Sequence, residues 1–362
     1  MKYCLFLSLQ LLALNSIAQY IPKWTFKVIQ SSDSTVIDVN SKGAEGIAFG
    51  FESGRAVKVN GEYHIFISEM CGKPFWINMQ FGHWKSTDRL NWSRVSTIAK
   101  SAYQTKDKYK SAIWNPYPVF DSVDNVWRMF YGGYPYPDKI DSMGFSANLN
   151  GVIWQSVSTV AGKNGIGGPY RDEKIILKQT DKDAGDWEGT FGDYTFTPFQ
   201  VGKKWYAFFN SGDPFTTPRS WLAGLCFAPK LSGPWKRTGL VPGKIIEPKD
   251  LFQELVIVTT LPDVTYAAVY DGHNPYDDVG ITYSKDGINW TKGEGIIVQN
   301  LKGNHWATGG VRTPLGLIDE GNGLYTMFFS GYYGVPDDRK DKGFIPGDKS
   351  GIGFVVLKLT AR

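Results

Sequence analysis

The sequence predicts an all-β fold, a five-bladed β-propeller that forms a single domain over residues 19–362. Three observations support this prediction. A hairpin followed by a further strand recurs five times along the 362 residues, and glycine and tryptophan return at corresponding places in these units. No segment shows the apolar spacing of an amphipathic helix. Repeated units of about 40–70 residues indicate a propeller or another array rather than a sandwich.

Residues 1–18 are expected to be a cleaved signal peptide. Lys2 supplies the positive start, Leu5–Leu14 is a short apolar run, and Ser16-Ile17-Ala18 forms a small-residue cleavage site before Gln19. The run is too short to cross a membrane, and no later segment is apolar for long enough. No lipobox cysteine lies near the cleavage site. We therefore expect an exported protein, periplasmic or secreted, that does not span the membrane.

The first unit contains the clearest hairpin, Phe51–Glu69, which turns at Asn60-Gly61. Asn-Gly between two alternating runs indicates a type I′ turn, because both central positions need a positive φ. Strands near Phe81–Thr87 and Ser93–Ile98 complete this unit. Ahead of it, Trp24–Gln30 is expected to be a lone strand.

The same order of segments returns in four further units. The second contains WNPYPVF, VWRMFYGG and MGFSANLNGVIW; the third contains DYTFTPFQVGKKWYAFFNSG and AGLCFAPKLSGPW; the fourth contains QELVIVTTLPDVTYAAVYDG and VGITYSKDGINW; the fifth contains VRTPLGLIDEGNGLYTMFFSGY and GIGFVVLKL. The fifth unit ends after its third strand. We expect the N-terminal strand Trp24–Gln30 to supply the missing fourth and so to close the ring by pairing the two ends of the chain.

Two residue types mark equivalent positions in these units. A glycine starts each third strand, and a turn then leads to a tryptophan in four of the units. The glycines are Gly82, Gly144, Gly224, Gly280 and Gly353, and the tryptophans are Trp92, Trp154, Trp235 and Trp290. Their uneven spacing predicts a constant four-stranded blade with loops of variable length, roughly 68 residues per unit.

Composition restricts the partners of the protein. The formal net charge is +4, or +3 without Lys2, and no Lys/Arg run is present, which argues against nucleic acid. The four histidines lie too far apart for metal-ligand spacing. Cys71 and Cys226 remain once Cys4 leaves with the signal peptide, and the sequence leaves open whether they pair. We expect a monomer that binds an oligo- or polysaccharide, in which most aromatic residues fill the sheets and a minority stack on sugar rings.

The hairpins resemble those of the five-bladed propeller glycosidases, the superfamily that contains glycoside hydrolase families 43, 32, 68 and 117. ESGRAVKVNGEYHIF takes the place of the acidic first-blade strand, and IWNPYPVF resembles the second-blade motif. DYTFTPFQVGKKWYAF and ELVIVTTLPDVTYAAVYD are similar to the third- and fourth-blade motifs. The resemblance covers nearly the whole mature chain and implies the same architecture.

Acids at the starts of inner strands are the candidate catalytic residues. These starts meet at the mouth of a propeller's funnel, and glycoside hydrolysis needs one protonated and one ionised carboxyl group there. By the resemblance, Glu52 is the base or nucleophile, Asp193 the modulator of the acid's pKa, and Glu254 the general acid. For each, the alternative is a solvated acid at a strand end. Glu69 and Glu188 are the substitutes.

Further residues are expected to bind substrate. Trp114 and Asn115 begin the second unit, Arg312 begins the fifth, His305 precedes it, and Trp84 and Trp187 are possible sugar platforms. Arg312 could pair with a carboxylate of the protein or of a uronic acid, or bridge neighbouring blades. A structural role is the alternative for the histidine, and packing between blades for the tryptophans. No cofactor is required, and the resemblance allows a structural calcium ion near the axis.

These observations predict an exported glycoside hydrolase. We expect exo cleavage at the end of a plant or algal polysaccharide side chain, with an arabinofuranoside as the first substrate to test. A second hypothesis is a non-catalytic, sugar-binding propeller. A third is a polysaccharide lyase, for which His64, His83 and Arg55 would have to converge. A propeller fold does not choose among these, because propellers carry many functions.

Overall fold

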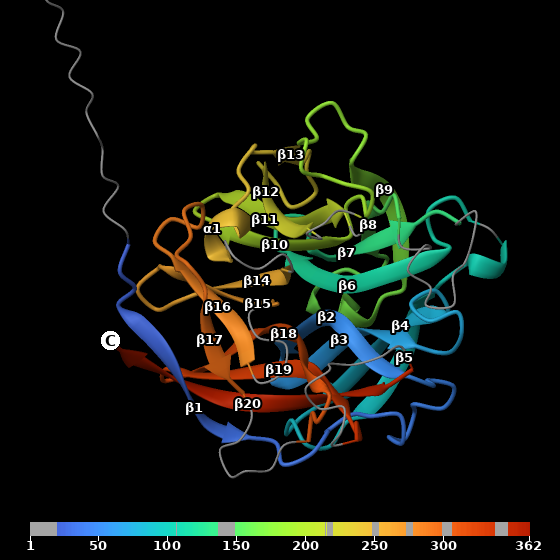
Figure 1. The fold of residues 1–362 in the computed structure, drawn as a ribbon, viewed down its shortest axis with the longest axis horizontal. Coiled ribbons are helices and arrows are strands. Elements are labelled where there is room, and N and C mark those ends of the chain that lie inside the picture. The colour runs from blue at the N-terminus through green and yellow to red at the C-terminus, as the bar shows by residue number, and fades with distance from the viewer. Residues whose placement is uncertain are drawn as a thin grey trace, which may run out of the picture.

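The computed structural model describes residues 20–105, 107–136, 149–213, 215, 220–247, 253–272, 278–298, 306–336 and 347–362. In these ranges five antiparallel sheets of four strands each surround a common axis (Figure 1). The predicted five-bladed β-propeller is confirmed.

Each blade runs outward from an inner strand at the axis. Blade 1 is β2 (Gly50–Val59), β3 (Glu62–Met70), β4 (Met79–Ser86) and β5 (Ser93–Lys100); blade 2 is β6 (Ala112–Asp121), β7 (Val126–Tyr134), β8 (Val152–Ser158) and β9 (Tyr170–Lys178); blade 3 is β10 (Thr195–Val201), β11 (Lys204–Asp213), β12 (Ser220–Ala228) and β13 (Lys236–Arg237). Blade 4 is β14 (Glu254–Thr260), β15 (Tyr266–Asp271), β16 (Asp278–Ser284) and β17 (Glu294–Ile297). Blade 5 is β18 (Gly310–Gly321), β19 (Leu324–Tyr333), β20 (Lys349–Ala361) and β1 (Trp24–Ser31).

The helical segments with described bounds are short and lie between strands. They are the 3₁₀ turns η1 (Tyr103–Thr105) and η3 (Lys163–Gly167) and the single-turn helix α1 (Gly243–Ile246). No helix in the described ranges is long and apolar enough to cross a membrane.

The ring closes by pairing the two ends of the chain, as predicted. β1 is antiparallel to β20, with Trp24 opposite Ala361 and Ser31 opposite Val355. Blade 5 therefore takes three strands from the C-terminal end and its outermost strand from the N-terminal end. The first hairpin also has its predicted turn, with φ of 52° at Asn60 and 87° at Gly61.

The third-strand glycines lie inside their strands rather than at the starts. A Cβ at Gly82 would lie 1.8 Å from Oε1 of Glu69, and a Cβ at Gly280 would lie 2.3 Å from the Tyr270 ring. Each glycine thus makes room for a large side chain from the neighbouring second strand. Gly224 faces Phe209 of β11 in the same way, Gly353 faces the ring of Trp306 ahead of β18, and Gly144 lies outside the described residues.

Two of the marker tryptophans follow turns built alike. In the turn from Ser284 to Trp290, Asp286 accepts backbone N–H groups from residues 288 and 289, and the indole donates to the carbonyl of Gly287 at 3.2 Å. The turn that leads to Trp92 repeats these contacts.

Trp235 also follows its third strand, but the prediction for Trp154 is wrong. It lies within the third strand β8, because that strand is Val152–Ser158 rather than the segment that begins MGFS. Residues 137–148 of that segment lie outside the described ranges.

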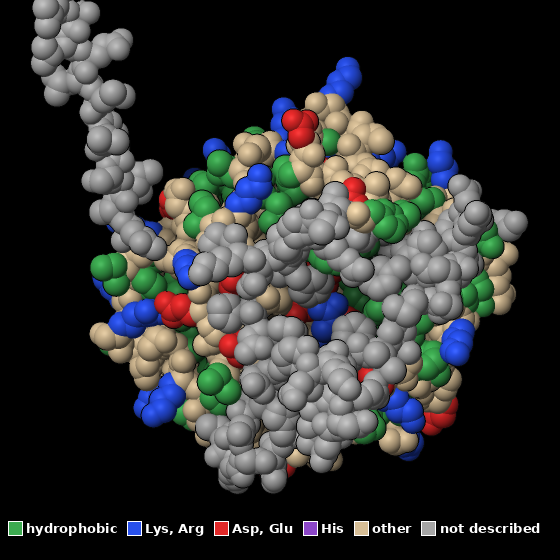
Figure 2. Space-filling model, in the orientation of Figure 1, with side chains coloured by type: hydrophobic (Ala, Val, Ile, Leu, Met, Phe, Trp, Pro, Cys, Tyr) green, Lys and Arg blue, Asp and Glu red, His purple; other side chains and the backbone are tan. Residues whose placement is uncertain are grey.

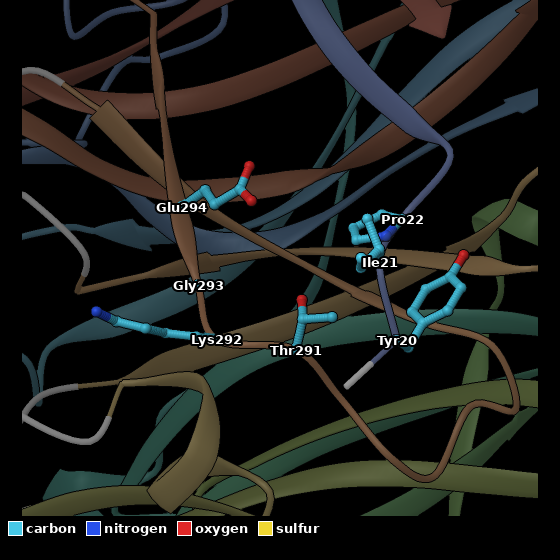
Figure 3. Close-up of a pocket in the computed structure, with 7 residues that line it drawn as sticks. All are labelled: Tyr20, Ile21, Pro22, Thr291, Lys292, Gly293 and Glu294. Carbon is cyan, nitrogen blue, oxygen red and sulfur yellow. The ribbon is translucent and has the colours of Figure 1, made fainter. Parts of the chain in front are cut away.

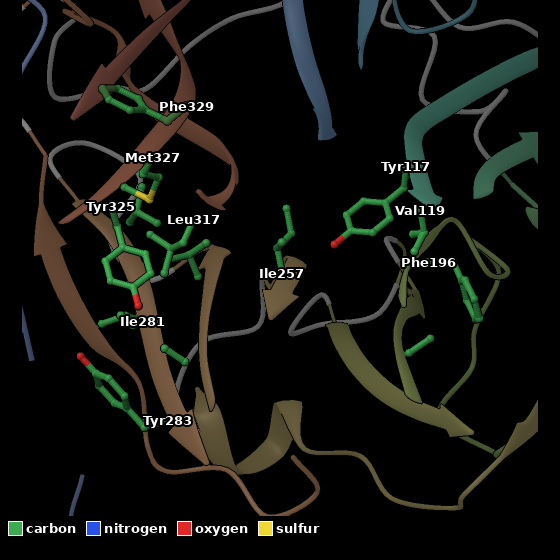
Figure 4. Packing of buried hydrophobic residues seen from close by; sticks show 14 of the residues in the cluster. Tyr117, Val119, Phe196, Ile257, Ile281, Tyr283, Leu317, Tyr325, Met327 and Phe329 are labelled. Carbon is green, nitrogen blue, oxygen red and sulfur yellow. The ribbon is translucent and has the colours of Figure 1, made fainter. Parts of the chain in front are cut away.

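Apolar side chains of the inner strands fill the propeller below the mouth of the funnel. Tyr117 of β6, Phe196 of β10, Ile257 of β14 and Leu317 of β18 are buried in one cluster (Figure 4). Arg55 of β2 lies over the Tyr117 ring, 4.4 Å from its centroid. Cys226 belongs to the same cluster, and both it and Cys71 are free thiols.

Candidate active site

Four inner strands are irregular just where they begin. Their register shifts between Glu52 and Gly54, Trp114 and Tyr117, Glu254 and Ile257, and Val311 and Pro314. In three of them the residue after the first named position is left-handed, with φ of 61° at Ser53, 59° at Asn115 and 53° at Leu255. Bulges re-aim side chains, and they are frequent beside active sites.

These irregular starts bring an arginine and three carboxyl groups together. Nε of Arg312 donates to Oε1 of Glu52 at 2.7 Å, Nη1 donates to Oδ2 of Asp271, and Nη2 lies 3.6 Å from Oε2 of Glu254. The four residues, here called the axial centre, come from blades 5, 1 and 4. Acidic and basic side chains are visible together near the centre of this face (Figure 2).

Glu52 is the most completely hydrogen-bonded carboxyl group of the axial centre. Its Oε2 accepts hydrogen bonds from the hydroxyl of Tyr332 at 3.1 Å and from Nε1 of Trp76 at 3.4 Å. With Arg312, three donors hold the carboxyl group, and it has no exposed surface. Trp76 has a φ of 60°, which is a rare conformation for a bulky residue.

Glu254 is held less tightly than Glu52. Its Oε2 is buried and has no hydrogen-bond partner in the described part of the chain. Burial raises the pKa of Glu254 to about 7; Arg312 opposes this rise, and Asp271 and Glu52 add to it. This carboxyl group therefore keeps its proton to higher pH than an ordinary glutamate, as a general acid requires.

Asp271 is a site residue that the sequence analysis missed. It ends β15 and is the ladder partner of Glu254 at the start of β14. Burial raises its pKa to about 6, against the effect of Arg312 and with that of Glu52. The sequence signal was an acid at the end of a second strand. In an antiparallel hairpin the end of the second strand lies beside the start of the inner strand, so both positions reach the funnel mouth.

Aromatic residues surround the axial centre, and most of them were also missed. Tyr194 lies ahead of β10, Tyr134 ends β7, and burial together with the charge of Glu254 raises the pKa of both hydroxyls. The Tyr194 hydroxyl is a neighbour of the Glu254 carboxyl group, and their interaction lowers the pKa of Glu254. Trp114, a predicted substrate-binding residue, packs in the same cluster as these tyrosines and Trp76.

Asn115 lies at the start of β6, as predicted, and is buried. Its Oδ1 accepts a hydrogen bond from Oγ of Ser53 at 3.2 Å, which ties blade 2 to blade 1. Its Nδ2 is buried without a hydrogen-bond partner among the described residues. His305, the other predicted residue near the axis, lies outside the described ranges.

Asp193 does not join the axial centre. Its Oδ2 accepts from Nη2 of Arg237 at 2.8 Å, and burial raises its pKa well above the usual range. Successive side chains of an extended segment point in opposite directions, so the funnel receives its neighbour Tyr194 instead. β10 also lacks the register shift of the other inner strands.

Glu188 is bound to the same arginine as Asp193. Its Oε2 accepts from Nη2 of Arg237 at 2.7 Å, and Nε donates to Oε1 at 2.8 Å. Asp181 and Asp183 pair with Nη1 at 3.3 and 3.0 Å. This Arg237 centre lies at the outer strand of blade 3, so the structure groups these two predicted acids with each other and not with Glu254.

Glu69 is bound inside blade 1. Oε1 accepts from Trp84 at 2.8 Å and from Nε of Arg94 at 3.0 Å, and Oε2 accepts from Gln80 at 2.8 Å and Nη2 of Arg94 at 2.7 Å. Trp84 is fully buried by this contact, so it presents no face to a sugar.

Trp187 likewise packs inside blade 3. Its ring lies 5.4 Å from that of Phe209, and it belongs to the partly buried residues around the main core. Trp84 therefore has the packing role that was its alternative, whereas Trp187 packs against Phe209 with part of its surface exposed and its role as a sugar platform stays a prediction.

The residues named for a lyase do not converge at the funnel. Nδ1 of His64 lies 2.9 Å from Nε2 of His83 within blade 1, and burial lowers the pKa of His83 to about 3. Arg55 turns instead to blade 2, where it donates to the carbonyl of Pro118 at 2.5 Å. Two neutral histidines without an arginine cannot neutralise a uronate.

No group of three or more potential ligands in the described ranges is arranged to hold a metal ion. A separate hollow of about 660 Å³ lies between residues 20–22 and 291–294 (Figure 3). Its carboxylate, Glu294, is paired with Arg362 at 2.5 Å. It lacks the facing carboxyl groups of the axial centre, so it is not the candidate site.

Neither a model of a known protein family nor a curated protein sequence matches this chain. Solved structures do. A family 117 glycoside hydrolase of the marine bacterium Zobellia galactanivorans is 12% identical, with a TM-score of 0.60 over 92% of this chain and 90% of the other. A protein described as a glycoside hydrolase is 15% identical, with a TM-score of 0.62 over 87% and 89%. A thermostable family 43 glycoside hydrolase is 13% identical, with a TM-score of 0.54 over 86% and 93%. The chain thus has the fold of the five-bladed propeller glycoside hydrolases.

Proposed function

We propose that this protein is a glycoside hydrolase in which Glu254 is the general acid and Glu52 the base or nucleophile. The observation that carries the proposal is the axial centre itself. Two carboxyl groups from different blades lie on either side of one arginine, at the funnel mouth of a fold shared with glycoside hydrolases. Their environments differ as the reaction requires.

Each residue has a definite role in this reaction. Glu254 gives its proton to the oxygen of the leaving group, because burial keeps that proton bound near neutral pH. Glu52 then activates water or attacks the anomeric carbon, and Arg312 holds it in place. A working separation of about 5–5.5 Å between the carboxyl groups gives retention, and about 6.5–9.5 Å gives inversion.

The substrate is proposed to be the uncharged end of a saccharide chain. Each nitrogen of Arg312 faces a carboxyl group of the protein, so the alternative in which Arg312 binds a uronate has no support. The apolar filling below the mouth favours a blind pocket and exo cleavage. The resemblance of the hairpins to the propeller glycosidases makes a furanoside the first substrate class to test, with an arabinofuranoside from plant or algal polysaccharide as the first choice.

Export is part of the proposal. It rests on residues 1–18, whose charge, apolar run and small residues are those of a signal peptide. Expression of the full chain followed by N-terminal sequencing of the exported protein tests it. A first residue of Gln19 supports export, and an uncleaved chain retained in the cytoplasm contradicts it.

One observation favours the second candidate, a non-catalytic sugar-binding propeller. Glu52 has no exposed surface, and both of its oxygens are already bonded. A base that is covered by Trp76 and Tyr332 cannot reach water without movement of these side chains. The two functions differ in turnover, so activity decides between them.

The test is release of monosaccharide from a panel of aryl glycosides and of plant and algal polysaccharides. Wild type is compared with Glu254→Gln and Glu52→Gln, which keep shape and remove the ionisable group. We expect release by wild type and a loss of about 10²–10⁴-fold in each variant. Sugar binding without turnover would support the binding propeller, and equal activity in all three proteins would contradict both assignments.

A further inference from the structure

We propose that Asp271 is a positioning residue of this reaction: it fixes Arg312 between Glu52 and Glu254 and couples electrostatically to Glu254. The inference rests on the proposed function and goes beyond it. The resemblance placed a third carboxyl group in blade 3, at Asp193. The structure assigns that part to the second strand of blade 4.

The first argument is the geometry of the guanidinium group. It is a rigid planar fork, so an acid that binds one nitrogen sets the direction of the others. Asp271 holds Nη1, while Nε donates to Glu52 at 2.7 Å and Nη2 points to Glu254 at 3.6 Å. Without Asp271, two carboxyl groups would remain to fix the fork, and one of them makes only the long contact.

The second argument is where Asp271 stands relative to Glu254. The two residues are ladder partners on adjacent strands of one blade, so they belong to the same wall of the funnel. Glu52 comes from blade 1, across Arg312 of blade 5. Asp271 and Glu254 therefore approach Arg312 from one side, and Glu52 approaches it from the other. Asp271 acts through its neighbours.

The third argument is the set of charges that face Glu254. They are Arg312 from β18, Asp271 from β15 and Glu52 from β2, with the hydroxyls of Tyr194 and Tyr134 beside them. Asp271 raises the pKa of Glu254, and Arg312 lowers it. A neutral residue at position 271 would remove the first effect and free the guanidinium group to strengthen the second, so both changes favour loss of the proton from Glu254.

Asp193 offers a matched control. It is also a fully buried aspartate that accepts from an arginine, at 2.8 Å, but its partners belong to the Arg237 centre. Asp181, Glu188 and Arg237 are the charges that act on it. Asp271→Asn and Asp193→Asn thus remove the same group from two arginine-bound sites, only one of which contacts Glu254's arginine.

The experiment follows the titration of Glu254 directly. Protein labelled with ¹³C at the glutamate carboxyl carbon is titrated by NMR, with Glu254→Gln to assign the signal. We expect the midpoint of Glu254 to fall by about one pH unit or more in Asp271→Asn and to stay in place in Asp193→Asn. An unmoved midpoint in Asp271→Asn, or an equal fall in both variants, would overturn the inference.

Kinetic measurements on the Asp271 variants are the second part of the experiment. In Asp271→Asn the alkaline limb of kcat/KM should move to lower pH with the NMR midpoint. In Asp271→Glu, which keeps the charge but lengthens the side chain, kcat should fall about tenfold or more while thermal stability is kept. Wild-type kcat in both variants would contradict a positioning role. Should the wild type turn over no substrate, the proposed function fails, and the titration alone still decides whether Asp271 couples to Glu254.

Discussion

The axial centre and the Glu69–Arg94 pair of blade 1 contain the same residue types but differ in how completely their carboxyl groups are hydrogen-bonded. Each buries a glutamate against an arginine near a tryptophan indole. Both oxygens of Glu69 accept two hydrogen bonds each, from Trp84, Gln80 and Arg94. Glu254 has an oxygen without a hydrogen-bond partner in the described residues and only a 3.6 Å contact to Arg312.

The two glutamates differ in saturation, by which we mean how many of the carboxyl lone pairs accept hydrogen bonds. A buried carboxylate whose lone pairs are all used can stabilise the fold but has nothing left for a substrate. A buried carboxyl group that is left partly unsatisfied lowers stability, and it persists where that incomplete state serves a function. The Arg237 centre lies between these cases, because Glu188 is bound bidentately while Oδ1 of Asp193 has no hydrogen-bond partner in the described ranges.

The largest expected contrast comes from one substitution at two sites. Glu254→Gln should lower kcat by about 10³-fold and leave the unfolding free energy nearly unchanged or raised, because it removes an incompletely bonded carboxyl group. Glu69→Gln should leave kcat per folded molecule unchanged and lower the unfolding free energy by about 1–3 kcal/mol, because the partly buried Arg94 loses its charged partner. Denaturant unfolding and turnover of both proteins measure the contrast. A stability loss at Glu254 as large as that at Glu69 would break the comparison.

Removing the arginines sharpens the comparison further. Arg312→Met should raise the pKa of Glu254 and of Asp271, since Arg312 lowers both. The alkaline limb of activity should then move to higher pH, with kcat about 10²-fold lower because Glu52 loses its partner. Arg94→Met should shift no limb and only reduce stability. Activity profiles of the two variants from pH 5 to pH 9 provide the check.

The wild-type pH profile tests the axial centre without mutation. Glu254 must carry its proton to act as acid, and burial raises its pKa to about 7. The logarithm of kcat/KM should therefore fall above about pH 7 with a slope near −1. A profile that stays level to pH 9 would remove Glu254 from the role of acid.

A substitution at Gly82 tests how tightly the space around Glu69 is packed. Gly82→Ala would place a Cβ 1.8 Å from Oε1 of Glu69 and should lower the unfolding free energy by about 1–3 kcal/mol. Gly167→Ala is the control, because its Cβ would meet only the His83 ring, at 3.6 Å. Activity of the folded fraction should not change in either. Equal stability of the two variants would show that the space around Glu69 is not tightly filled.

The smallest effect near neutral pH concerns His64 and His83. Burial lowers the pKa of both, that of His83 to about 3, so the unfolded chain binds more protons than the folded one below about pH 6.5. Stability should thus decline as pH falls from about 6.5 towards 3. His83→Phe, which keeps the stacking on Phe66, should flatten this decline in thermal melts. An unchanged slope would assign the decline to other groups.

The fold was predictable because its signals are local. Asn60-Gly61 requires a hairpin, alternating runs require strands, and the missing fourth strand of the last unit required the lone segment at Trp24. Each of these follows from the conformational preferences of a few neighbouring residues, and the structure confirms them. The one misplaced third strand contains Trp154; the segment MGFSANLNGVIW offers two glycines, Gly144 and Gly151, and the strand β8 begins directly after the second.

The site was predictable only in part. The rule that inner-strand starts meet at the axis located Glu52, Glu254 and Arg312. It failed at Asp193, because a one-residue difference in an extended segment reverses the side chain, and only β10 among the inner strands lacks the bulge that would re-aim it. The same rule also overlooked Asp271, which lies at the funnel mouth at the end of β15, the second strand of blade 4.

The sequence by itself determined the number of blades, the closure of the ring and the residue types available at the funnel mouth. Only the tertiary structure decided which acids share an arginine. Glu69, Glu188 and Glu254 are all glutamates at or near the ends of strands or in the loops that join them, and nothing in their immediate sequence distinguishes them. Their saturation depends on partners 25, 49 and 58 residues away, Arg94, Arg237 and Arg312. Such contacts are set by how the blades pack, which no local pattern encodes.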